Sequence, residues 1–316
     1  MKIAWLYAGQ GSQAPGMGRD IYEAYPETRD IFDSAAAGFD LRAMCFDSDA
    51  QTLAKTRYTQ PCMAAFAATV TRILKGFGLR PDYTAGLSLG EYSALHAAGV
   101  WDAETLLGVL AFRGLAMERS AAGVDSRMTA VLGLDAEKVG RAVADASSSG
   151  LGVVAVTNVN CPGQIVIGGE TAAVIAAEKE CLALGAKRCL PLNTSGPFHT
   201  PLMENASVEL REKLASTALL PPEIPVIFNV TGETAAAAVD EETIFDDEIR
   251  GLLCLGVKSP VLFEKTVRTL DALGVDTAIE IGPGRALSGF VRRTAPNMRV
   301  LSIESAEDLE KARAWL

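Results

Sequence analysis

A serine in a tight glycine-flanked turn is the first feature of the sequence that points to chemistry. Residues 86–90 read Gly-Leu-Ser-Leu-Gly, a G-x-S-x-G pattern between a short apolar run and a helical pattern. The two glycines allow a strand-to-helix turn that would present the Ser88 hydroxyl at the carboxyl edge of a sheet. There the backbone N–H of Leu89 and the helix N-terminus would face a developing oxyanion. The pattern also suits a serine that only caps a helix, so the assignment depends on a base.

The candidate base follows from elimination, because the chain has only two histidines. A serine hydroxyl needs a base within hydrogen-bonding distance. His96 lies eight residues beyond Ser88 on the same predicted helix, about 12 Å further along its axis, and cannot reach it. His199 lies in a loop-forming Ser-Gly-Pro-Phe-His-Thr-Pro segment, a common place for catalytic groups, although a lone loop histidine is more often structural. No triad carboxylate stands out, and a backbone carbonyl could orient the imidazole instead.

An arginine on an apolar helix face is a further candidate. The helical pattern over residues 103–122 places Arg113 on the face that carries Leu106, Val109, Leu110, Ala116 and Met117. A buried guanidinium is costly unless it is paired. It would form either an internal ion pair with an Asp or Glu, or a bidentate fork around the carboxylate of a ligand.

Composition limits the classes of protein that remain. The 316 residues are 49% hydrophobic and 22% charged, as in a globular protein with a full core, and the net charge of −10 argues against nucleic acid or an anionic membrane as a partner. No secretory signal and no apolar stretch of the roughly 18 residues that a membrane helix needs is visible. The six scattered cysteines form no C-x-x-C pair. We therefore expect a cytoplasmic protein with reduced thiols and no metal site.

The order of the predicted elements places these residues on an α/β fold. Short β-rich runs alternate with longer helical patterns, which is typical of a mostly parallel sheet covered by helices. The clearest strands are 3–8, 83–88, 226–230, 277–282 and 299–303, and the clearest helices are 60–76, 91–99, 103–122, 259–273 and 284–294. A last helix follows Ser305, where Ser-Ala-Glu-Asp forms a capping box. The acidic stretch 240–248 is expected to be a solvated loop and helix start.

Residues 127–192 differ from the rest of the chain. They predict the order strand, helix, strand, strand, helix, strand, which is the split-βαβ unit of ferredoxin-like folds. We therefore expect an inserted subdomain over 127–192, with residues 1–126 and 193–316 forming one large α/β domain.

Nine sequence blocks, in order along nearly the whole chain, resemble malonyl-CoA:acyl-carrier-protein transacylases and the related acyltransferase domains of fatty-acid and polyketide synthases. They are AGQGSQ (8–13), YTQP (58–61), GLSLGEYSAL (86–95), FRGLAM (112–117), MTAVLGL (128–134), NVNCPGQIVIGG (158–169), SGPFHTPLM (195–203), FNVTGE (228–233) and EIGPGRALSGFVRR (280–293). The resemblance implies a hydrolase-like α/β domain with a ferredoxin-like insert, in agreement with the predicted elements.

The resemblance also implies roles for individual residues. Ser88 would carry the malonyl group, with His199 as its base, and Arg113 would bind the free carboxylate of malonyl. The backbone N–H groups of Gln10 and Leu89 would form the oxyanion hole. A neutral acetyl chain would leave the buried guanidinium unpaired, which would explain a preference for malonyl. The residues expected to line or support the substrate pocket are Met117, Phe198, Asn160, Gln60 and Gly256.

The implied reaction is a ping-pong transfer of malonyl from malonyl-CoA to the phosphopantetheine thiol of acyl carrier protein, supplying extender units for fatty-acid synthesis. No metal or redox cofactor is implied; CoA and the carrier are the expected partners, and we expect a monomer. An acidic carrier would need a basic patch, for which Lys187, Arg188, Arg292 and Arg293 are candidates. The alternatives are a stand-alone acyltransferase of a polyketide pathway, a serine thioesterase or hydrolase, and a non-catalytic acyl-binding module. Arg113 and the missing triad carboxylate argue against a hydrolase, and the three site residues together argue against a binding module.

Three positions depart from the pattern of the family. Leu87 replaces a histidine and Ala8 a proline, and both changes should leave the chemistry intact. Gly256 replaces a glutamine. Its backbone carbonyl could still accept the imidazole N–H, while the missing amide would leave a roomier or wetter site. Acyl selectivity and resistance to hydrolysis are therefore the properties that we expect to differ, although Phe198 resembles family members that select malonyl over branched extenders.

Overall fold

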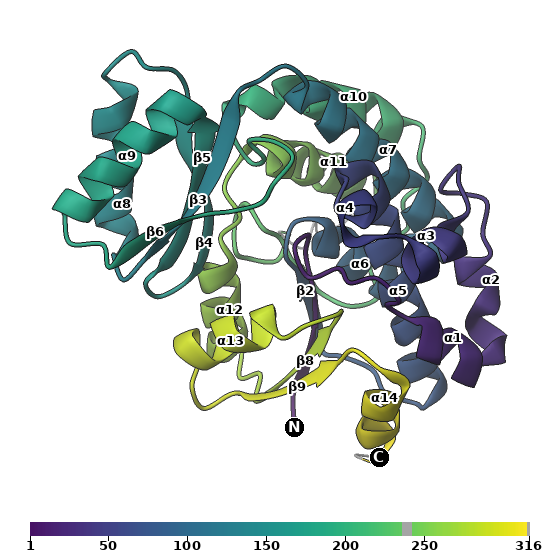
Figure 1. Cartoon of the computed structure of the whole chain (residues 1–316). Coiled ribbons are helices and arrows are strands. Elements are labelled where there is room, and N and C mark those ends of the chain that lie inside the picture. Colours follow the sequence, from purple (N-terminus) through teal and green to yellow (C-terminus); the bar gives the residue numbers. More distant parts are fainter. Residues whose placement is uncertain (236–241, 315–316) are drawn as a thin grey trace.

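The structure is a computed structural model that describes residues 1–235 and 242–314. Figure 1 shows a larger part, which contains both termini and a central sheet, and a smaller part beside it made of the teal segment in the middle of the chain. The acidic loop predicted over residues 240–248 lies partly outside the described residues.

A five-stranded parallel sheet forms the centre of the larger part. Its order is β7–β2–β1–β8–β9, and all four pairings are parallel. The strands are β1 (Ile3–Tyr7), β2 (Tyr83–Gly86), β7 (Val226–Ile227), β8 (Thr277–Ile281) and β9 (Arg299–Ile303). Every residue of β1 and β8 is buried, because helices cover both faces of the sheet, and this explains their continuous apolar sequences.

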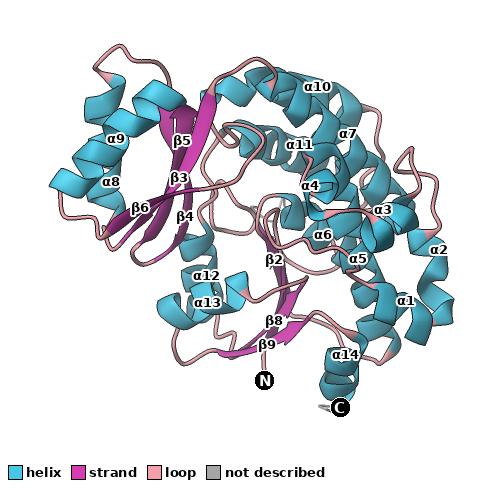
Figure 2. Cartoon of the chain, viewed as in Figure 1, coloured by secondary structure: helices cyan, strands magenta, loops and turns pink. Residues whose placement is uncertain are grey.

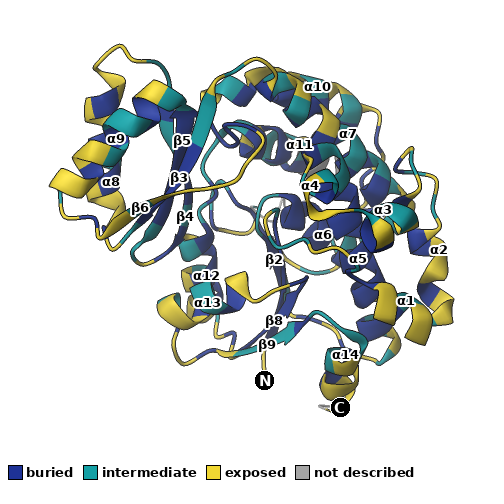
Figure 3. Cartoon of the chain, in the orientation of Figure 1, coloured by how far each residue is buried: buried dark blue, intermediate teal, exposed yellow. Residues whose placement is uncertain are grey.

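Alternate residues of β1 pack against different helical layers. Ile3, Trp5 and Tyr7 belong to the hydrophobic core on one face of the sheet, whereas Ala4 and Leu6 belong to a second core on the opposite face. Figure 3 shows the central strands and the inward helix faces in the dark blue of buried residues, whereas the edge strand β9 is largely teal. The sheet is therefore a rigid base, and side chains at its carboxyl edge are held from both sides.

Helices make up most of the remaining chain, as Figure 2 shows. In the larger part they are α1 (Arg19–Ala24), α2 (Arg29–Phe32), α3 (Leu41–Asp47), α4 (Ala50–Leu53), α5 (Thr56–Gly76), α6 (Leu89–Ala97), α7 (Ala103–Ala121), α10 (Glu204–Ala215), α11 (Glu242–Lys258), α12 (Phe263–Ala272), α13 (Ala286–Thr294) and α14 (Ala306–Arg313), with 3₁₀ turns at Pro26–Thr28 and Pro201–Met203. The capping box predicted at Ser305, at the start of α14, is partly confirmed. Ser305 accepts the Asp308 N–H as expected, but the Asp308 carboxylate accepts the N–H of Glu304 rather than that of Ser305.

Several predicted elements are shorter in the structure than in the prediction, and two of the differences have a clear structural cause. The strand predicted over 226–230 ends at Ile227, because the backbone N–H of Asn229 donates to the Glu91 side chain instead of to a neighbouring strand. The helix predicted over 259–273 begins at Phe263, because Val261 is paired with a strand of the smaller part. Both shortened ends lie near the candidate site.

The smaller part has the predicted ferredoxin-like order. It consists of β3 (Ser126–Leu132), α8 (Ala136–Ser147), β4 (Val154–Cys161), β5 (Gln164–Glu170), α9 (Thr171–Ala183) and β6 (Arg188–Pro191). The four strands form an antiparallel sheet in the order β4–β5–β3–β6, and α8 and α9 share a separate core with it. The prediction of an α/β fold with a βαββαβ insert is thus confirmed.

Main-chain hydrogen bonds join the two parts directly. Val159 donates its N–H to the Val261 carbonyl at 2.9 Å, and Val261 donates to the Thr157 carbonyl at 2.9 Å. The division of the chain into domains 1–126 with 193–316 and 127–192 stays a prediction. These bonds make the segment before α12 an extension of the smaller sheet.

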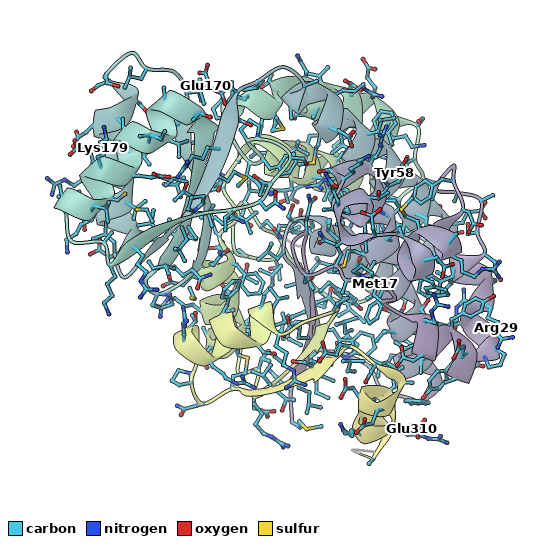
Figure 4. All side chains as sticks on the ribbon, in the orientation of Figure 1. Met17, Arg29, Tyr58, Glu170, Lys179 and Glu310 are labelled. Atoms are coloured by element: carbon cyan, nitrogen blue, oxygen red, sulfur yellow. The ribbon has the colours of Figure 1, made fainter. Side chains whose placement is uncertain are left out.

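Charged side chains such as Arg29, Lys179 and Glu310 are exposed and lie at the periphery of the molecule in Figure 4. Within the described residues, no helix combines the length and the apolar character that crossing a membrane requires.

Candidate active site

Ser88 occupies the turn between β2 and α6, at the carboxyl edge of the parallel sheet. Its backbone has φ 56° and ψ −107°, a combination that non-glycine residues rarely adopt. Among the non-glycine residues that the structure describes, only Ser88 and His199 (φ 62°) have a positive φ. Such conformations cost about 1–3 kcal/mol each and persist only where the surroundings hold them. The two residues that the sequence pairs as nucleophile and base are therefore also the two strained ones.

Close packing of backbone explains the two glycines around Ser88. A Cβ on Gly86 would lie 2.0 Å from the carbonyl carbon of Gly90, and a Cβ on Gly90 would lie 2.2 Å from the carbonyl oxygen of Tyr7. Any side chain at either position would push α6 away from the sheet. The G-x-S-x-G pattern thus lets the helix begin directly against β1 and β2 with the serine at its tip.

His199 forms the hydrogen bonds that a base for Ser88 needs. Its Nε2 lies 2.9 Å from Ser88 Oγ, and its Nδ1 lies 2.8 Å from the carbonyl oxygen of Gly256. Because a carbonyl oxygen can only accept, Nδ1 carries the proton, and the Nε2 lone pair faces the serine hydroxyl. The backbone carbonyl that the sequence analysis left open as an alternative to a triad carboxylate is the group observed here.

The C-terminus of α11 supplies this orienting group. The last four carbonyls of a helix lack partners within the helix. Two of them hold His199: the Gly256 carbonyl accepts the ring N–H, and the Val257 carbonyl accepts the backbone N–H of His199 at 3.2 Å. The partial negative charge at a helix C-terminus also favours a protonated imidazole during the reaction.

Burial makes His199 a neutral base. Its side chain is 5% exposed, and burial lowers the pKa of the imidazole to about 4, with the nearby Arg113 charge acting in the same direction. The hydrogen bond to Gly256 acts the other way but is the smaller influence. At neutral pH the imidazole is therefore unprotonated and able to accept the serine proton.

Arg113 brings a buried positive charge to the same hydroxyl. It is 2% exposed, its Nη2 donates to Ser88 Oγ at 3.1 Å, and its guanidinium lies over the Tyr92 ring with its central carbon 5.1 Å from the centroid. Its Nε and Nη1 find no hydrogen-bond acceptor among the described residues. Unpaired buried guanidinium N–H groups are costly, so this arrangement suits a ligand carboxylate that completes the pairing.

The internal ion pair considered as an alternative for Arg113 is not formed in the described part of the chain. Glu91 is the carboxyl group whose pKa the Arg113 charge influences, but Arg113 Nη2 binds Ser88 Oγ and its Nε and Nη1 have no partner among the described residues. Burial raises the pKa of Glu91 to about 7, and Arg113 offsets only part of this effect. Within the part of the chain that the structure describes, the Nε and Nη1 donors of Arg113 therefore stay without a partner while Nη2 binds Ser88 Oγ.

Gln10 and Leu89 occupy positions that fit the predicted oxyanion hole. Leu89 is the first residue of α6, where a helix N–H has no helical partner. Across the described residues, the backbone N–H of neither residue forms a hydrogen bond. The Gln10 loop lies against the serine turn because Gly9 permits it: a Cβ there would meet the Leu87 carbonyl oxygen at 2.6 Å. Their role in stabilising an oxyanion stays a prediction.

A pocket between the two sheets gathers most of the predicted residues. Those that line it are Gln10, Gln60, Ser88, Met117, Asn160, Phe198 and His199. The smaller part contributes Asn158 and Asn160 from β4, and α13 contributes Leu287 and Phe290. The side-chain oxygens of the buried Gln60 and Asn160 have no hydrogen-bond partner among the described residues, which leaves polar acceptors available to a ligand.

Leu89, Arg113 and Gly256 do not line this pocket but lie behind the residues that do. Arg113 reaches Ser88, and Gly256 reaches His199, through the hydrogen bonds described above. Beside Gly256, a Cβ would meet only Glu91 Oε2, at 3.6 Å. The space that a larger side chain would fill is thus next to the Glu91 carboxyl.

Two buried polar residues near Ser88 were not singled out in the sequence. Asn229 accepts the backbone N–H of Ser88, and Glu91 accepts the backbone N–H of Asn229. Both lie inside sequence blocks that resemble the family, and Glu91 follows the serine by three residues in a buried helix, which was the available signal. His96 is half-buried on α6 and does not reach Ser88; its Nδ1 lies 2.9 Å from the Trp101 carbonyl oxygen. No cluster of His, Cys, Asp or Glu within residues 1–235 and 242–314 could hold a metal ion.

Comparisons with known proteins identify the family of the chain. A model of the acyl transferase domain matches residues 4–313. The malonyl CoA-acyl carrier protein transacylase of Bacillus subtilis (strain 168) is 38% identical over 98% of this chain and 96% of its own length. Among solved structures, the MCAT of Streptococcus pneumoniae superposes with a TM-score of 0.92 at 39% identity over all of both chains. A type II polyketide acyl-carrier protein in complex with its malonyl-transacylase includes a chain with TM-score 0.92 and 33% identity, again over all of both chains.

An acyl transferase fold with a Ser–His pair at its sheet edge is therefore the class of protein that the structure defines, and the chain belongs to the acyl transferase domain family. Within that family it is a member of the malonyl-CoA:acyl-carrier-protein transacylases.

The pKa of His199 predicts how the reaction of Ser88 depends on pH. We expect the single-turnover rate of Ser88 acylation to stay flat from pH 8 down to about pH 5 and to fall with a midpoint near 4, where the imidazole gains its proton. An unfolded His199 titrates near 6.5, so the unfolded chain binds more protons between about pH 6.5 and 4, and the free energy of unfolding falls as the pH decreases through that window. Rapid-quench measurements on the wild type and on Glu91→Gln, which lacks the buried carboxyl next to Asn229, would test this. An acidic limb centred on 6.5 in both proteins would contradict it.

The contacts of Gly256 predict that its function lies in the carbonyl alone. Gly256→Ala should raise the free energy of unfolding by up to about 1 kcal/mol, because alanine favours a helix and its Cβ fits. The rate of malonyl transfer should stay within a factor of about two, because the acceptor for His199 is retained. Gly251→Ala, on the same helix with no atom near the added Cβ, is the matched control. Urea unfolding and steady-state kinetics measure both effects; a tenfold loss of kcat/KM in Gly256→Ala alone would show that the open space itself matters.

Proposed function

We propose that this protein transfers malonyl from malonyl-CoA to the phosphopantetheine thiol of an acyl carrier protein, through a malonyl ester on Ser88, and so supplies extender units for fatty-acid synthesis. One observation carries the assignment of residues: Ser88 Oγ lies 2.9 Å from His199 Nε2 and 3.1 Å from Nη2 of a buried guanidinium with unpaired donors. A base and a carboxylate-binding group thus meet at one hydroxyl. That combination fits a nucleophile whose substrate carries a carboxylate close to the reacting carbonyl.

In the first half-reaction, Arg113 binds the malonyl carboxylate and Ser88 Oγ attacks the thioester carbonyl carbon. The serine proton passes to His199 Nε2, and the backbone N–H groups of Gln10 and Leu89 stabilise the oxyanion. When the tetrahedral intermediate collapses, the C–S bond breaks and the CoA sulfur leaves with the proton from His199. The product is a malonyl ester on Ser88 with a neutral histidine.

In the second half-reaction, the phosphopantetheine thiol of the carrier gives its proton to His199 and its sulfur attacks the ester carbonyl. The C–O bond to Ser88 then breaks, and the serine oxygen recovers the proton from His199. Because a thioester is a more reactive acyl donor than an amide, a serine activated by a histidine with only a carbonyl behind it suffices for both steps.

Arg113 sets the length of the acyl group. Its Nη2 is within hydrogen-bonding distance of the nucleophile itself, so the carboxylate that it binds must lie very near the ester carbonyl. In malonyl a single CH₂ group separates the two. Acetyl would leave the buried donors unpaired, and longer diacids would carry the carboxylate past the guanidinium.

The carrier would reach the pocket over β6 and α13. The candidate basic residues for an acidic carrier, Lys187, Arg188, Arg292 and Arg293, lie on or beside these elements, and Leu192 and Phe290 of the same region line the pocket. Arg293 is already engaged with the side-chain oxygen of Gln164. The carrier in the solved complex with TM-score 0.92 belongs to a type II polyketide synthase, so a polyketide carrier is the second candidate, and carrier preference would distinguish the two pathways.

We place the protein in the cytoplasm, in keeping with six cysteines that are all free thiols. Action as a monomer is a further part of the proposal, which sedimentation would test.

A covalent malonyl adduct is the direct test of the proposed function. The wild-type protein mixed with malonyl-CoA should gain the mass of one malonyl group, and addition of phosphopantetheinylated carrier should remove it and produce malonyl-carrier. Ser88→Ala should show no adduct. Free malonate in place of malonyl-carrier, at the same rate with and without carrier, would identify a hydrolase and overturn the proposal.

Removal of the guanidinium should change specificity more than it changes catalysis. Arg113→Ala is expected to lower kcat/KM for malonyl-CoA by about 100-fold or more, because the carboxylate loses a charge-assisted bidentate partner. Acetyl-CoA, which has no carboxylate, should lose less than about tenfold, since the Ser88–His199 bond is retained. Parallel steady-state kinetics with both donors measure the ratio; an equal loss for both would place Arg113 in a purely structural role.

A further inference from the structure

Asn229 makes an unusual set of hydrogen bonds around the serine turn. Its side-chain Oδ1 accepts the backbone N–H of Ser88 at 2.7 Å, and its Nδ2 donates to the carbonyl oxygen of Gly86 at 2.7 Å. One amide therefore connects the backbone on both sides of Leu87. Asn229 is 2% exposed, and its position two residues past the end of β7 places it beside the carboxyl end of β2.

The turn needs such a support. Ser88 has a backbone conformation that would relax in an isolated peptide, and its N–H points away from the helix that it begins. A buried backbone N–H without a partner is costly, and so is the buried Gly86 carbonyl. Asn is suited to this position because its amide can accept at one atom and donate at the other.

We propose that Asn229 is a positioning residue, which holds the Ser88 turn in its strained conformation so that the hydroxyl faces His199 and Arg113. This inference rests on the proposed function of Ser88 as the malonyl-bearing nucleophile, and it deepens that function. Asn229 makes no hydrogen bond to His199, to Arg113 or to a pocket-lining side chain within the described residues, so it acts on the reaction only through Ser88.

Glu91 fixes Asn229 in turn. The backbone N–H of Asn229 donates to Glu91 Oε1 at 2.6 Å, and Glu91, 2% exposed, belongs to the helix that Ser88 begins. The three residues close a ring: Ser88 leads into α6, α6 carries Glu91, Glu91 binds Asn229, and Asn229 binds Ser88. Such a closed ring of buried hydrogen bonds keeps the turn from rotating as a unit.

The carbonyl of Asn229 extends the ring to the smaller part of the molecule. It accepts the N–H of Leu262 at 2.8 Å, and the adjacent Val261 pairs with β4 through the bonds to Thr157 and Val159. Asn158, at the same point of β4, lines the pocket. Asn229 thus connects the wall of the pocket with the nucleophile, through its main-chain carbonyl on one side and its side-chain amide on the other.

The test separates the attack step from substrate binding. Asn229→Ala removes both side-chain hydrogen bonds, and we expect the single-turnover rate of Ser88 malonylation to fall by about 100-fold, the loss typical of a nucleophile displaced by about 1 Å. Malonyl-CoA affinity, measured by calorimetry in a Ser88→Ala background with and without the second substitution, should change less than about twofold, because Arg113 is not touched. Thr71→Val is the matched control: it removes a buried 2.8 Å hydrogen bond to Tyr7 and should leave the acylation rate unchanged.

A second variant, Asn229→Asp, should show a pH dependence of the acylation rate that a loss of stability could not produce. In Asn229→Asp, the protonated side chain can accept from Ser88 and donate to Gly86, whereas the ionised one places an anion against the Gly86 carbonyl. The acylation rate of this variant should therefore rise as the pH falls from 8 to about 6, while the wild-type rate stays flat. The titratable groups of the surrounding elements, Glu91 on α6, Arg113 on α7 and His199, are present in both proteins, so a pH dependence confined to the variant belongs to position 229.

The possible outcomes distinguish a failure of the proposed function from a failure of the positioning role of Asn229. If the wild type forms no malonyl adduct, the proposed function fails. If the wild type is acylated and both Asn229 variants react within about threefold of it at all pH values, the proposed function stands and the positioning role is overturned. Weakened malonyl-CoA binding equal to the loss of rate would also overturn it, since the residue would then support the pocket rather than the serine. Should Asn229→Ala not fold, the pH profile of Asn229→Asp decides alone: a flat profile contradicts the inference.

Discussion

The site is built around one hydrogen-bonded hydroxyl, Ser88 Oγ, which lies at the N-terminal end of α6 within hydrogen-bonding distance of both an imidazole and a guanidinium. Ser88 can occupy this position because the backbone of α6 packs directly on the backbone of β1 and β2. At Gly86 and Gly90 the contacts are so close that no Cβ would fit. The parallel sheet supplies a fixed edge for the turn, and buried hydrogen bonds hold the strained serine there. Rigidity of the larger part is thus the condition for the chemistry, since attack on a thioester requires the hydroxyl to stay within a narrow range of orientations.

His199 is oriented by backbone carbonyls and not by a carboxylate, and this suits the modest basicity that the proposed reaction needs. The end of α11 presents carbonyl oxygens that helices leave unpaired, and Gly256 and Val257 use them to hold the ring and the backbone of His199. A carbonyl fixes the tautomer as a carboxylate would, but it adds no full negative charge. Together with burial and the Arg113 charge, this keeps the imidazole neutral and only moderately basic. In the proposed reaction a thioester donor and a thiol acceptor need no stronger base, and the unpaired Arg113 donors would bind the carboxylate of the acyl group.

Much of this arrangement could be predicted from the sequence, for reasons that differ between residues. Ser88 and His199 could be paired because the chain offers few groups of the required chemistry, and Arg113 stood out because helical periodicity placed a charge on an apolar face. The βαββαβ insert followed from the order of short local patterns. Asn229 could not be found in this way, because its partners Ser88, Glu91 and Gly86 lie 141, 138 and 143 residues away and only the tertiary fold brings them together. The early end of β7 and the late start of α12 have the same cause. Local sequence preference predicts a longer strand and a longer helix, but the backbone groups at these ends form long-range hydrogen bonds instead.

A crystal structure of the protein trapped with its malonyl group would show whether Ser88 carries the acyl chain next to Arg113. We expect a malonyl ester on Ser88 Oγ, with its carboxylate on the Nε and Nη1 side of Arg113 and its carbonyl oxygen toward the backbone N–H groups of Gln10 and Leu89. The imidazole of His199 should keep its bond to the Gly256 carbonyl in that complex. A malonyl group attached to any other side chain, or one on Ser88 whose carboxylate points to solvent with Arg113 still unpaired, would contradict it.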